Sequence, residues 1–135
     1  MNNTIEEIEQ SFWGDPPENS TNVITKCYNL RKKKLNEFSV DDFRFLIGQN
    51  RALEILIPKA LILLNKDIFV EGDFYEGDLL ENVLKSEKAF WKNHPEMKRN
   101  IIELFEINYH RLEILDIPEE IKEELKKAYN GFKAD

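Results

Sequence analysis

The sequence contains few of the residues that disulfide-linked and metal-binding proteins depend on. The single cysteine, Cys27, excludes an internal disulfide, and it lies in an apolar helical stripe without a Cys-x-x-Cys partner. Core packing therefore explains it better than a role as nucleophile. Neither His94 nor His110 begins a metal-ligand pattern, which favours helix-terminal or surface positions for both. We expect no metal, no cofactor and no catalytic residue.

Long apolar runs are also missing. The longest stretch, Leu53–Leu64, is interrupted by charged residues and by Pro58, and it is much shorter than the ~20 residues of a membrane span. The first thirteen residues carry glutamates where a signal peptide needs a basic region followed by an apolar one. The sequence thus predicts a cytoplasmic protein without a membrane segment.

Basic residues are outnumbered. Lys and Arg total 19 against 26 Asp and Glu, so the net charge is -7. Nucleic-acid binders carry a basic footprint that contacts phosphates, and this balance argues against one. An acidic protein suits a basic partner, although solubility alone also accounts for such a charge. Nucleotide-binding and serine-hydrolase motifs are absent: there is no GxGxxG, P-loop or GxSxG.

Apolar side chains are sufficient for one core, because 41% of the 135 residues are hydrophobic and nine of them are Phe. Apolar residues recur at helical spacing, and capping residues such as Thr4 and Ser39 precede several of these runs. We predict an all-α, compact helical bundle of about six to eight helices, with residues 1–135 as a single domain. The expected helices cover about residues 5–13, 23–34, 40–47, 52–64, 79–84, 87–93 and 96–115, with a last helix from 118 onwards.

Several helix ends carry specific signals. Pro58 is expected to kink or break its helix, and a short strand near 55–57 is the less favoured alternative. Asp78 and Ser86 are expected to cap the helices that follow them. Pro95 and Pro118 suit helix starts, while Gly131 is a candidate for a C-terminal cap.

One segment, Asp67–Glu81, holds six acidic residues and no basic one. We call it the acidic segment. Read as an EF-hand loop with Gly72 at the invariant glycine, it places Phe69 where an oxygen ligand belongs, so it fails as a calcium site. A carboxylate-based or metal-dependent hydrolase using Asp73, Glu76 and Asp78 is an alternative. Such a site requires particular distances in space between its carboxyl groups, which the sequence does not show.

Two further interpretations of the acidic segment remain open. As a structural loop, its glycines permit turns, its aspartates cap backbone amides and its aromatic residues pack onto the core. As an interface, its charge steers a basic partner and its aromatic residues supply contact area. Both can hold together, with Phe74 pointing inward and Glu71 or Glu76 pointing outward.

An ordered set of short motifs adds a family resemblance. The motifs read LRKKKL at residues 30–35, FLIGQN at 45–50, LIPKAL at 56–61 and GDFYEGDLL at 72–80. In this order they resemble the helical immunity proteins of contact-dependent growth inhibition (CDI) systems, over about Phe12–Trp91. Lys34 and Glu76 stand where the family pattern has proline, and Ala52 where it has glycine.

The resemblance implies a cytoplasmic immunity protein that binds and neutralises a cognate toxin domain delivered by a neighbouring cell. Toxins of such systems are often nucleases with basic, phosphate-binding clefts, which agrees with the acidic charge. The acidic segment is the expected contact with the toxin. Its expected toxin-binding residues are Glu71, Asp73, Tyr75, Glu76 and Asp78. An acidic helical adaptor for an endogenous protein is a further alternative.

Overall fold

The computed structural model describes residues 3–135 and is all-α. Its helices are α1 (Ile5–Glu9), α2 (Asn22–Arg31), α3 (Val40–Gly48), α4 (Leu53–Lys66), α5 (Asp78–Leu84), α6 (Lys88–Lys92), α7 (Pro95–Ile114) and α8 (Glu119–Ala134), with a 3-10 turn η1 (Leu35–Glu37). No β-strand occurs between residues 3 and 135, where one isolated bridge pairs Glu71 with Glu76. The predicted fold class is confirmed.

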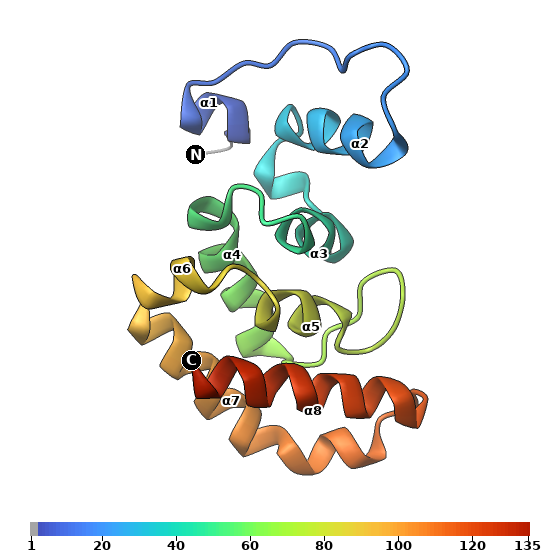
Figure 1. Cartoon of the computed structure of the whole chain (residues 1–135), viewed down its shortest axis with the longest axis vertical. Coiled ribbons are helices and arrows are strands. Elements are labelled where there is room, and N and C mark those ends of the chain that lie inside the picture. Colours follow the sequence, from blue (N-terminus) through green and yellow to red (C-terminus); the bar gives the residue numbers. More distant parts are fainter. Residues whose placement is uncertain (1–2) are drawn as a thin grey trace.

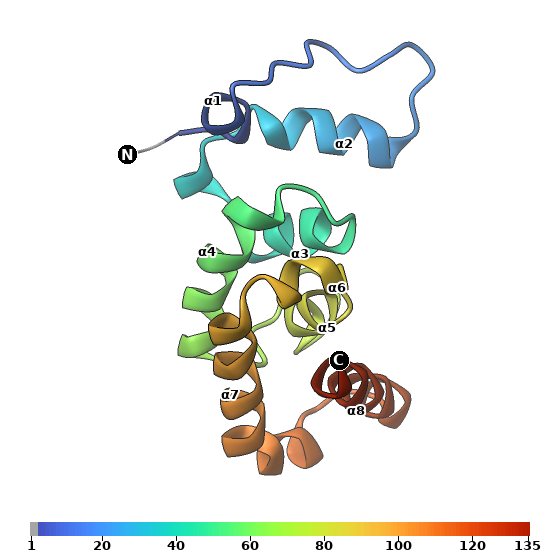
Figure 2. The same ribbon diagram turned by 60° about the vertical axis from the view of Figure 1, so that its left-hand side comes forward.

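The helices are stacked roughly in chain order. Figures 1 and 2 show α1 and α2 at one end, α3, α4 and α5 in the middle, and α7 and α8 at the other end. Helix α5 packs on both α3 and α8, and α4 packs on α3 and α7. Buried apolar side chains from every helix join in one hydrophobic cluster. The acidic segment leads from α4 into α5 and so enters the middle of this stack.

Helix α5 is short but deeply buried. Leu79, Leu80 and Val83 are fully buried, and they anchor the end of the acidic segment between α3 and α8. Phe69, near the start of the segment, is also buried and lies edge-on to Phe105 of α7, with ring centroids 6.4 Å apart. Since burial of a large apolar side chain contributes about 1.5–3 kcal/mol, the core fixes both ends of the segment.

The predicted caps of α1 and α3 are confirmed. Thr4 and Glu7 form a capping box, and Ser39 and Asp42 form another. Helix α1 is nevertheless shorter than expected, because Gln10 adopts a left-handed conformation (φ 53°) and ends it. Trp13 therefore lies in the following loop, where its ring packs 4.1 Å from the guanidinium carbon of Arg31.

The break considered at Pro58 does not occur, because α4 continues through this residue. Residues 55–57 are helical, so the favoured helix is confirmed and the less favoured strand is wrong. A proline inside a helix removes one hydrogen bond, but here Leu56, Ile57 and Ala60 are fully buried on both sides of it. Their burial outweighs the lost bond.

The caps predicted for α5, α6 and α8 need correction. Gly77, not Asp78, is the N-cap of α5, with the left-handed φ of 90° that glycine adopts readily. Glu87, not Ser86, precedes α6, and the Ser86 hydroxyl instead accepts a hydrogen bond from the indole of Trp91 (2.9 Å). Gly131 lies within α8, because the next residue, Phe132, is buried and continues the helix against Trp91.

Candidate interaction surface

The acidic segment turns around one buried carboxylate. Asp78 is 3% exposed and its two oxygens accept backbone N–H groups from Gly72 (2.7 Å), Phe74 (3.0 Å) and Tyr75 (3.4 Å). The sequence places Asp78 at the first position of α5, where a negative charge is favourable next to the helix dipole. Its carboxylate thus organises the loop instead of facing a partner.

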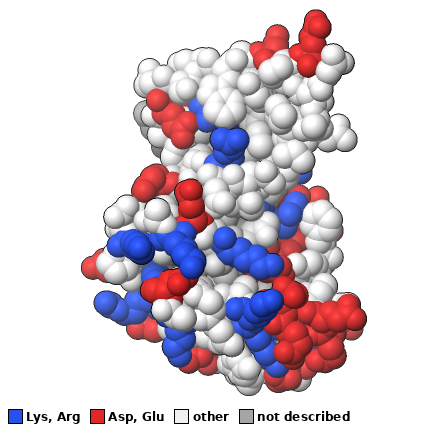
Figure 3. All heavy atoms as spheres, in the orientation of Figure 1, with Lys and Arg blue, Asp and Glu red and all other residues white. Residues whose placement is uncertain are grey.

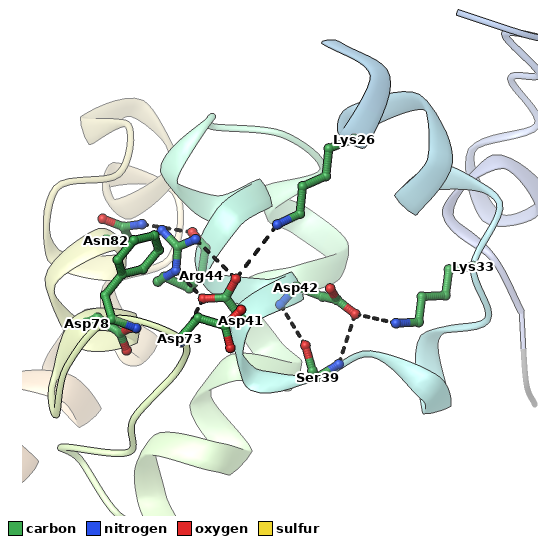
Figure 4. A network of polar contacts seen from close by, with 10 residues as sticks. Lys26, Lys33, Ser39, Asp41, Asp42, Arg44, Asp73, Asp78 and Asn82 are labelled. Atoms are coloured by element: carbon green, nitrogen blue, oxygen red, sulfur yellow. Dashed lines mark hydrogen bonds and ion pairs between the residues drawn. The ribbon is translucent and has the colours of Figure 1, made fainter. Parts of the chain in front are cut away.

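A second carboxylate reaches the segment from α3. Asp41 accepts the Asp73 N–H (3.0 Å) and forms a bidentate pair with the guanidinium of Arg44. Lys26 of α2 approaches its other oxygen at 3.7 Å. Figure 4 shows Asp41 between Lys26 and Arg44, with the segment carrying Asp73 and Asp78 beside it. Three stretches of chain that are distant in sequence therefore meet at Asp41.

The backbone of residue 72 lies so close to the carboxylates of Asp41 and Asp78 that this position favours glycine. A Cβ on Gly72 would lie 3.0 Å from an oxygen of Asp41 and 3.0 Å from an oxygen of Asp78. Any larger side chain would push these two carboxylates away from the amides that they bind. Gly48 has a comparable role on α3, where a Cβ would come within 2.6 Å of the Asn82 amide nitrogen. Asn82 donates from that nitrogen to the backbone carbonyl of Arg44 (2.9 Å).

The charges of this network stabilise each other. The hydrogen bond from Arg44, together with the Asp73 amide and the charges of Arg44 and Lys26, lowers the pKa of Asp41 from 3.8 to about 2 against the opposing effect of burial. The same hydrogen bond raises the pKa of Arg44. Both groups remain charged at neutral pH, so the segment is held by permanent charge-assisted hydrogen bonds.

Phe74 is presented outward by this framework. Its side chain is 66% exposed, while its amide is bound by Asp78. The guanidinium carbon of Arg44 lies 4.4 Å from the ring centroid, a cation-π distance. The expectation that Phe74 points inward is wrong, because Phe69 fills the core position at the start of the segment. A large aromatic ring is thus exposed on a fixed backbone.

Tyr75 faces the other way. Its hydroxyl donates to Glu81 (2.5 Å), whose second oxygen accepts from Lys85 (2.8 Å). Burial, followed by the hydrogen bond to Glu81, raises the pKa of Tyr75 well above its usual range. The ring of Tyr75 is half-buried and its hydroxyl remains protonated. Tyr75 therefore mainly supports the loop and leaves little free surface.

The five predicted binding residues therefore fall into three environments. Glu71 and Asp73 are exposed, Tyr75 and Glu76 are half-buried, and Asp78 is buried. Sequence reasoning missed Asp41 and Arg44, which lie more than 20 residues before the segment. An acidic first turn in α3 is explained equally well by the helix dipole, so no local signal indicated this role.

The other candidate chemistries have clear structural explanations. Cys27 is buried, and burial raises the pKa of its thiol, which confirms core packing. His94 precedes α7 and lies 2.9 Å from Glu54, which confirms a helix-terminal position. Among residues 3–135 no group of three His, Cys, Asp or Glu side chains is arranged to hold a metal ion. In that same range, no helix is long and apolar enough to cross a membrane.

Comparison with protein families matches the chain to the CDI immunity proteins over residues 7–101. The match includes α2 to α6 and the whole acidic segment. The chain belongs to the CDI immunity protein family. Membership in this family assigns the chain a toxin-neutralising immunity function and a cognate CDI toxin as partner. No curated protein and no solved structure matches the chain.

The family match ends within α7, so helix α8 and most of α7 lie outside the matched range. The Asp41–Arg44–Asp78 network and the acidic segment lie inside it. The part of this immunity protein that the family match covers thus carries the outward-facing Phe74 and the carboxylates that fix it.

Proposed function

We propose that this immunity protein neutralises a nuclease toxin domain by docking the acidic segment on the toxin's basic, phosphate-binding surface. Phe74, with Glu71 and Asp73 beside it, forms the centre of the contact. Tyr75 and Asp78 support the segment from behind. The half-buried Glu76 adds negative charge to the segment. The protein acts by stoichiometric binding, without catalysis, and in the cytoplasm, where a delivered nuclease meets its substrate.

The observation that carries this proposal is an exposed aromatic ring on a backbone that is already fixed. Single exposed apolar residues are common on protein surfaces, and exposure alone indicates nothing. Phe74 differs because Asp78 binds its amide and Arg44 covers one face of its ring. A contact residue that is ordered before binding loses less conformational entropy on association, which favours affinity.

Charge supports the same assignment. Glu71 and Asp73 are exposed, and neither forms an ion pair with another residue in the described range of 3–135. Exposed carboxylates around an aromatic ring attract a cationic surface and accelerate encounter with it. A cleft that binds nucleic-acid phosphates presents such a surface.

The hydrolase alternative loses support from the same geometry. It requires Asp73, Glu76 and Asp78 to act on a common substrate, but Asp78 is buried and its oxygens already accept three backbone amides. A carboxylate committed to the loop in this way cannot also serve as a general acid or base without dismantling the turn.

The test compares two double variants with the same change in net charge. Glu71→Lys with Asp73→Lys reverses the charge beside Phe74, whereas Glu18→Lys with Glu103→Lys reverses two exposed carboxylates on other elements. We expect the first variant to slow association with the cognate toxin domain by about tenfold at low salt, measured by stopped-flow or surface plasmon resonance. The second should remain within about twofold of wild type.

Salt supplies an internal control, because steering between exposed charges is screened over about 10 Å at 0.1 M ionic strength. The difference between the two variants should therefore shrink as salt is raised. Equal association rates for both variants at low salt would rule out the acidic segment as the steering surface.

A further inference from the structure

A large groove lies at the opposite end of α5 from the acidic segment. It has a volume of about 1060 Å³ and is bounded by the end of α5, by α6, by the first turns of α7 and by the last turns of α8. Helix α8 lies outside the range matched by the CDI immunity family, whereas α5, α6 and the first turn of α7 lie inside it. The groove is thus completed by a helix, α8, that the family match does not cover.

The groove is basic, although the protein is acidic. Three acidic residues line it, Glu87, Glu124 and Asp135. Six basic residues line it as well: Lys85, Lys88, Lys92, Lys98, Arg99 and Lys127. Figure 3 shows Lys and Arg gathering over α6 and the C-terminal part of α8, while Asp and Glu gather over the N-terminal end of α8. A chain with a net charge of -7 thus concentrates positive charge at one place.

Half of these basic residues are free to meet a ligand. Lys85 pairs with Glu81 and Glu124, and Lys88 pairs with Asp135. Lys98 donates to the main-chain oxygen of Asp135 (2.6 Å). The other three, Lys92, Arg99 and Lys127, are exposed, and none of them pairs with an acidic residue anywhere in residues 3–135.

The floor of the groove is apolar. Ile102 and Ala128 are half-buried and leave part of their apolar surface uncovered. Trp91 and Phe132 also line the groove, but both are buried and their rings pack edge-to-face at 5.0 Å. Proteins that bind single-stranded nucleic acid offer exposed aromatic faces on which bases stack, and these two rings offer none. An apolar floor with a basic rim suits a ligand that has an apolar face and acidic flanks.

We propose that this groove binds an acidic amphipathic helix of a partner protein. A helix with its side chains is about 10–12 Å wide and rises about 5.4 Å per turn, so about two turns fill roughly 1000 Å³. The apolar face of the helix lies on Ile102 and Ala128, and its acidic residues pair with Lys92, Arg99 and Lys127. This is the helix-in-groove mode of recognition with charge complementarity added. It does not depend on toxin binding by the acidic segment.

The probe is a fluorescein-labelled 14-residue peptide with leucine at helical spacing on one face and glutamate on the other. We expect fluorescence anisotropy to show saturable binding that weakens as salt is raised. A matched peptide with lysine in place of every glutamate should bind at least tenfold more weakly. No binding at about 100 μM protein, or equal affinity for both peptides, would overturn the proposal.

Gly131 offers a matched pair of variants. It lines the groove, and a Cβ at this position meets nothing within 4 Å. Gly131→Trp should obstruct the groove and weaken peptide binding at least tenfold, whereas Gly131→Ala keeps the groove open and should bind as wild type does. Circular dichroism would establish that both variants remain folded.

The basic rim is tested by reversing Lys92, Arg99 and Lys127 to glutamate together. This variant should bind the acidic peptide at least tenfold more weakly and lose most of the salt dependence. Unchanged peptide affinity in this variant and in Gly131→Trp would overturn the proposal. So would tighter binding of a single-stranded oligonucleotide than of the peptide, or self-association abolished by Gly131→Trp, since these outcomes assign the groove to nucleic acid or to a second copy.

Discussion

Replacing Asp41 with asparagine should destabilise the protein in a way that depends on pH. Asparagine has nearly the same shape as the protonated carboxyl group, so it removes the charge that binds Arg44 and the Asp73 amide. The pKa of Asp41 falls from 3.8 to about 2 in the folded protein. Each pKa unit corresponds to about 1.4 kcal/mol, so ionised Asp41 contributes about 2.5 kcal/mol to the free energy of unfolding at neutral pH.

The direction of the pH dependence follows from the linkage between proton binding and folding. A carboxyl group whose pKa is depressed on folding stabilises the protein fully above its unfolded pKa, here 3.8, and loses that effect as the pH falls through about 2. By pH 3 the contribution should have decreased by about 1 kcal/mol. The stability difference between wild type and Asp41→Asn should therefore narrow by that amount between pH 6.5 and pH 3.

Urea denaturation of both proteins across this range measures the difference directly, and the other carboxylates cancel because both proteins share them. A difference that stays constant from pH 6.5 to pH 3 would refute the assignment of Asp41 as a charged support. A variant as stable as wild type at pH 6.5 would refute it equally.

Three further predictions concern stability. Ala52 has a left-handed backbone (φ 51°), which is unfavourable for a residue with a Cβ. Ala52→Gly should therefore raise the free energy of unfolding by about 1 kcal/mol, measured by urea denaturation. A lower free energy of unfolding in this variant would show that the backbone at residue 52 is not strained. Gly131 lies within α8, so Gly131→Ala should raise it by about 0.5–1 kcal/mol, whereas a C-terminal cap would make the same change destabilising. Finally, residues 1–135 are predicted to be a single domain, so circular dichroism and tryptophan fluorescence should report one coincident thermal transition; two separate transitions would show two units.

Local signals in the sequence were sufficient to place most helices. The capping boxes at Thr4 and Ser39 and the proline at the start of α7 depend on residues within one turn of each other, and all three are confirmed. The family pattern also indicated Ala52 as an unusual position, and its left-handed φ explains why glycine is expected there.

Predictions failed where distant packing decides the outcome. A proline usually interrupts a helix, but the buried residues on both sides of Pro58 hold α4 together. A glycine near a chain end resembles a cap, but Phe132 extends α8 because it packs on Trp91. Neither the burial of α4 around Pro58 nor the contact of Phe132 with Trp91 can be identified from the local sequence.

The acidic segment shows the same division. Its charge and its turn-forming residues were visible in the sequence, and Glu71 and Asp73 are exposed as a binding surface requires. The direction of Phe74 was predicted incorrectly, because Phe69 fills the core position and the Phe74 ring instead packs on Arg44, which α3 contributes. The role of Asp78 as the centre of the turn depends on amides up to six residues away and needed the structure as well.

The central claim is that the acidic segment contacts the toxin, and titration of toxin activity tests it most directly. Wild-type protein added to a fixed amount of cognate toxin domain should abolish activity at about one equivalent. Phe74→Ala should bind about 30-fold more weakly, since truncation of a central aromatic contact typically costs about 2 kcal/mol, and combined with Glu71→Lys and Asp73→Lys it should leave most of the activity at one equivalent. Complete neutralisation by one equivalent of this triple variant, with wild-type affinity, would contradict the claim.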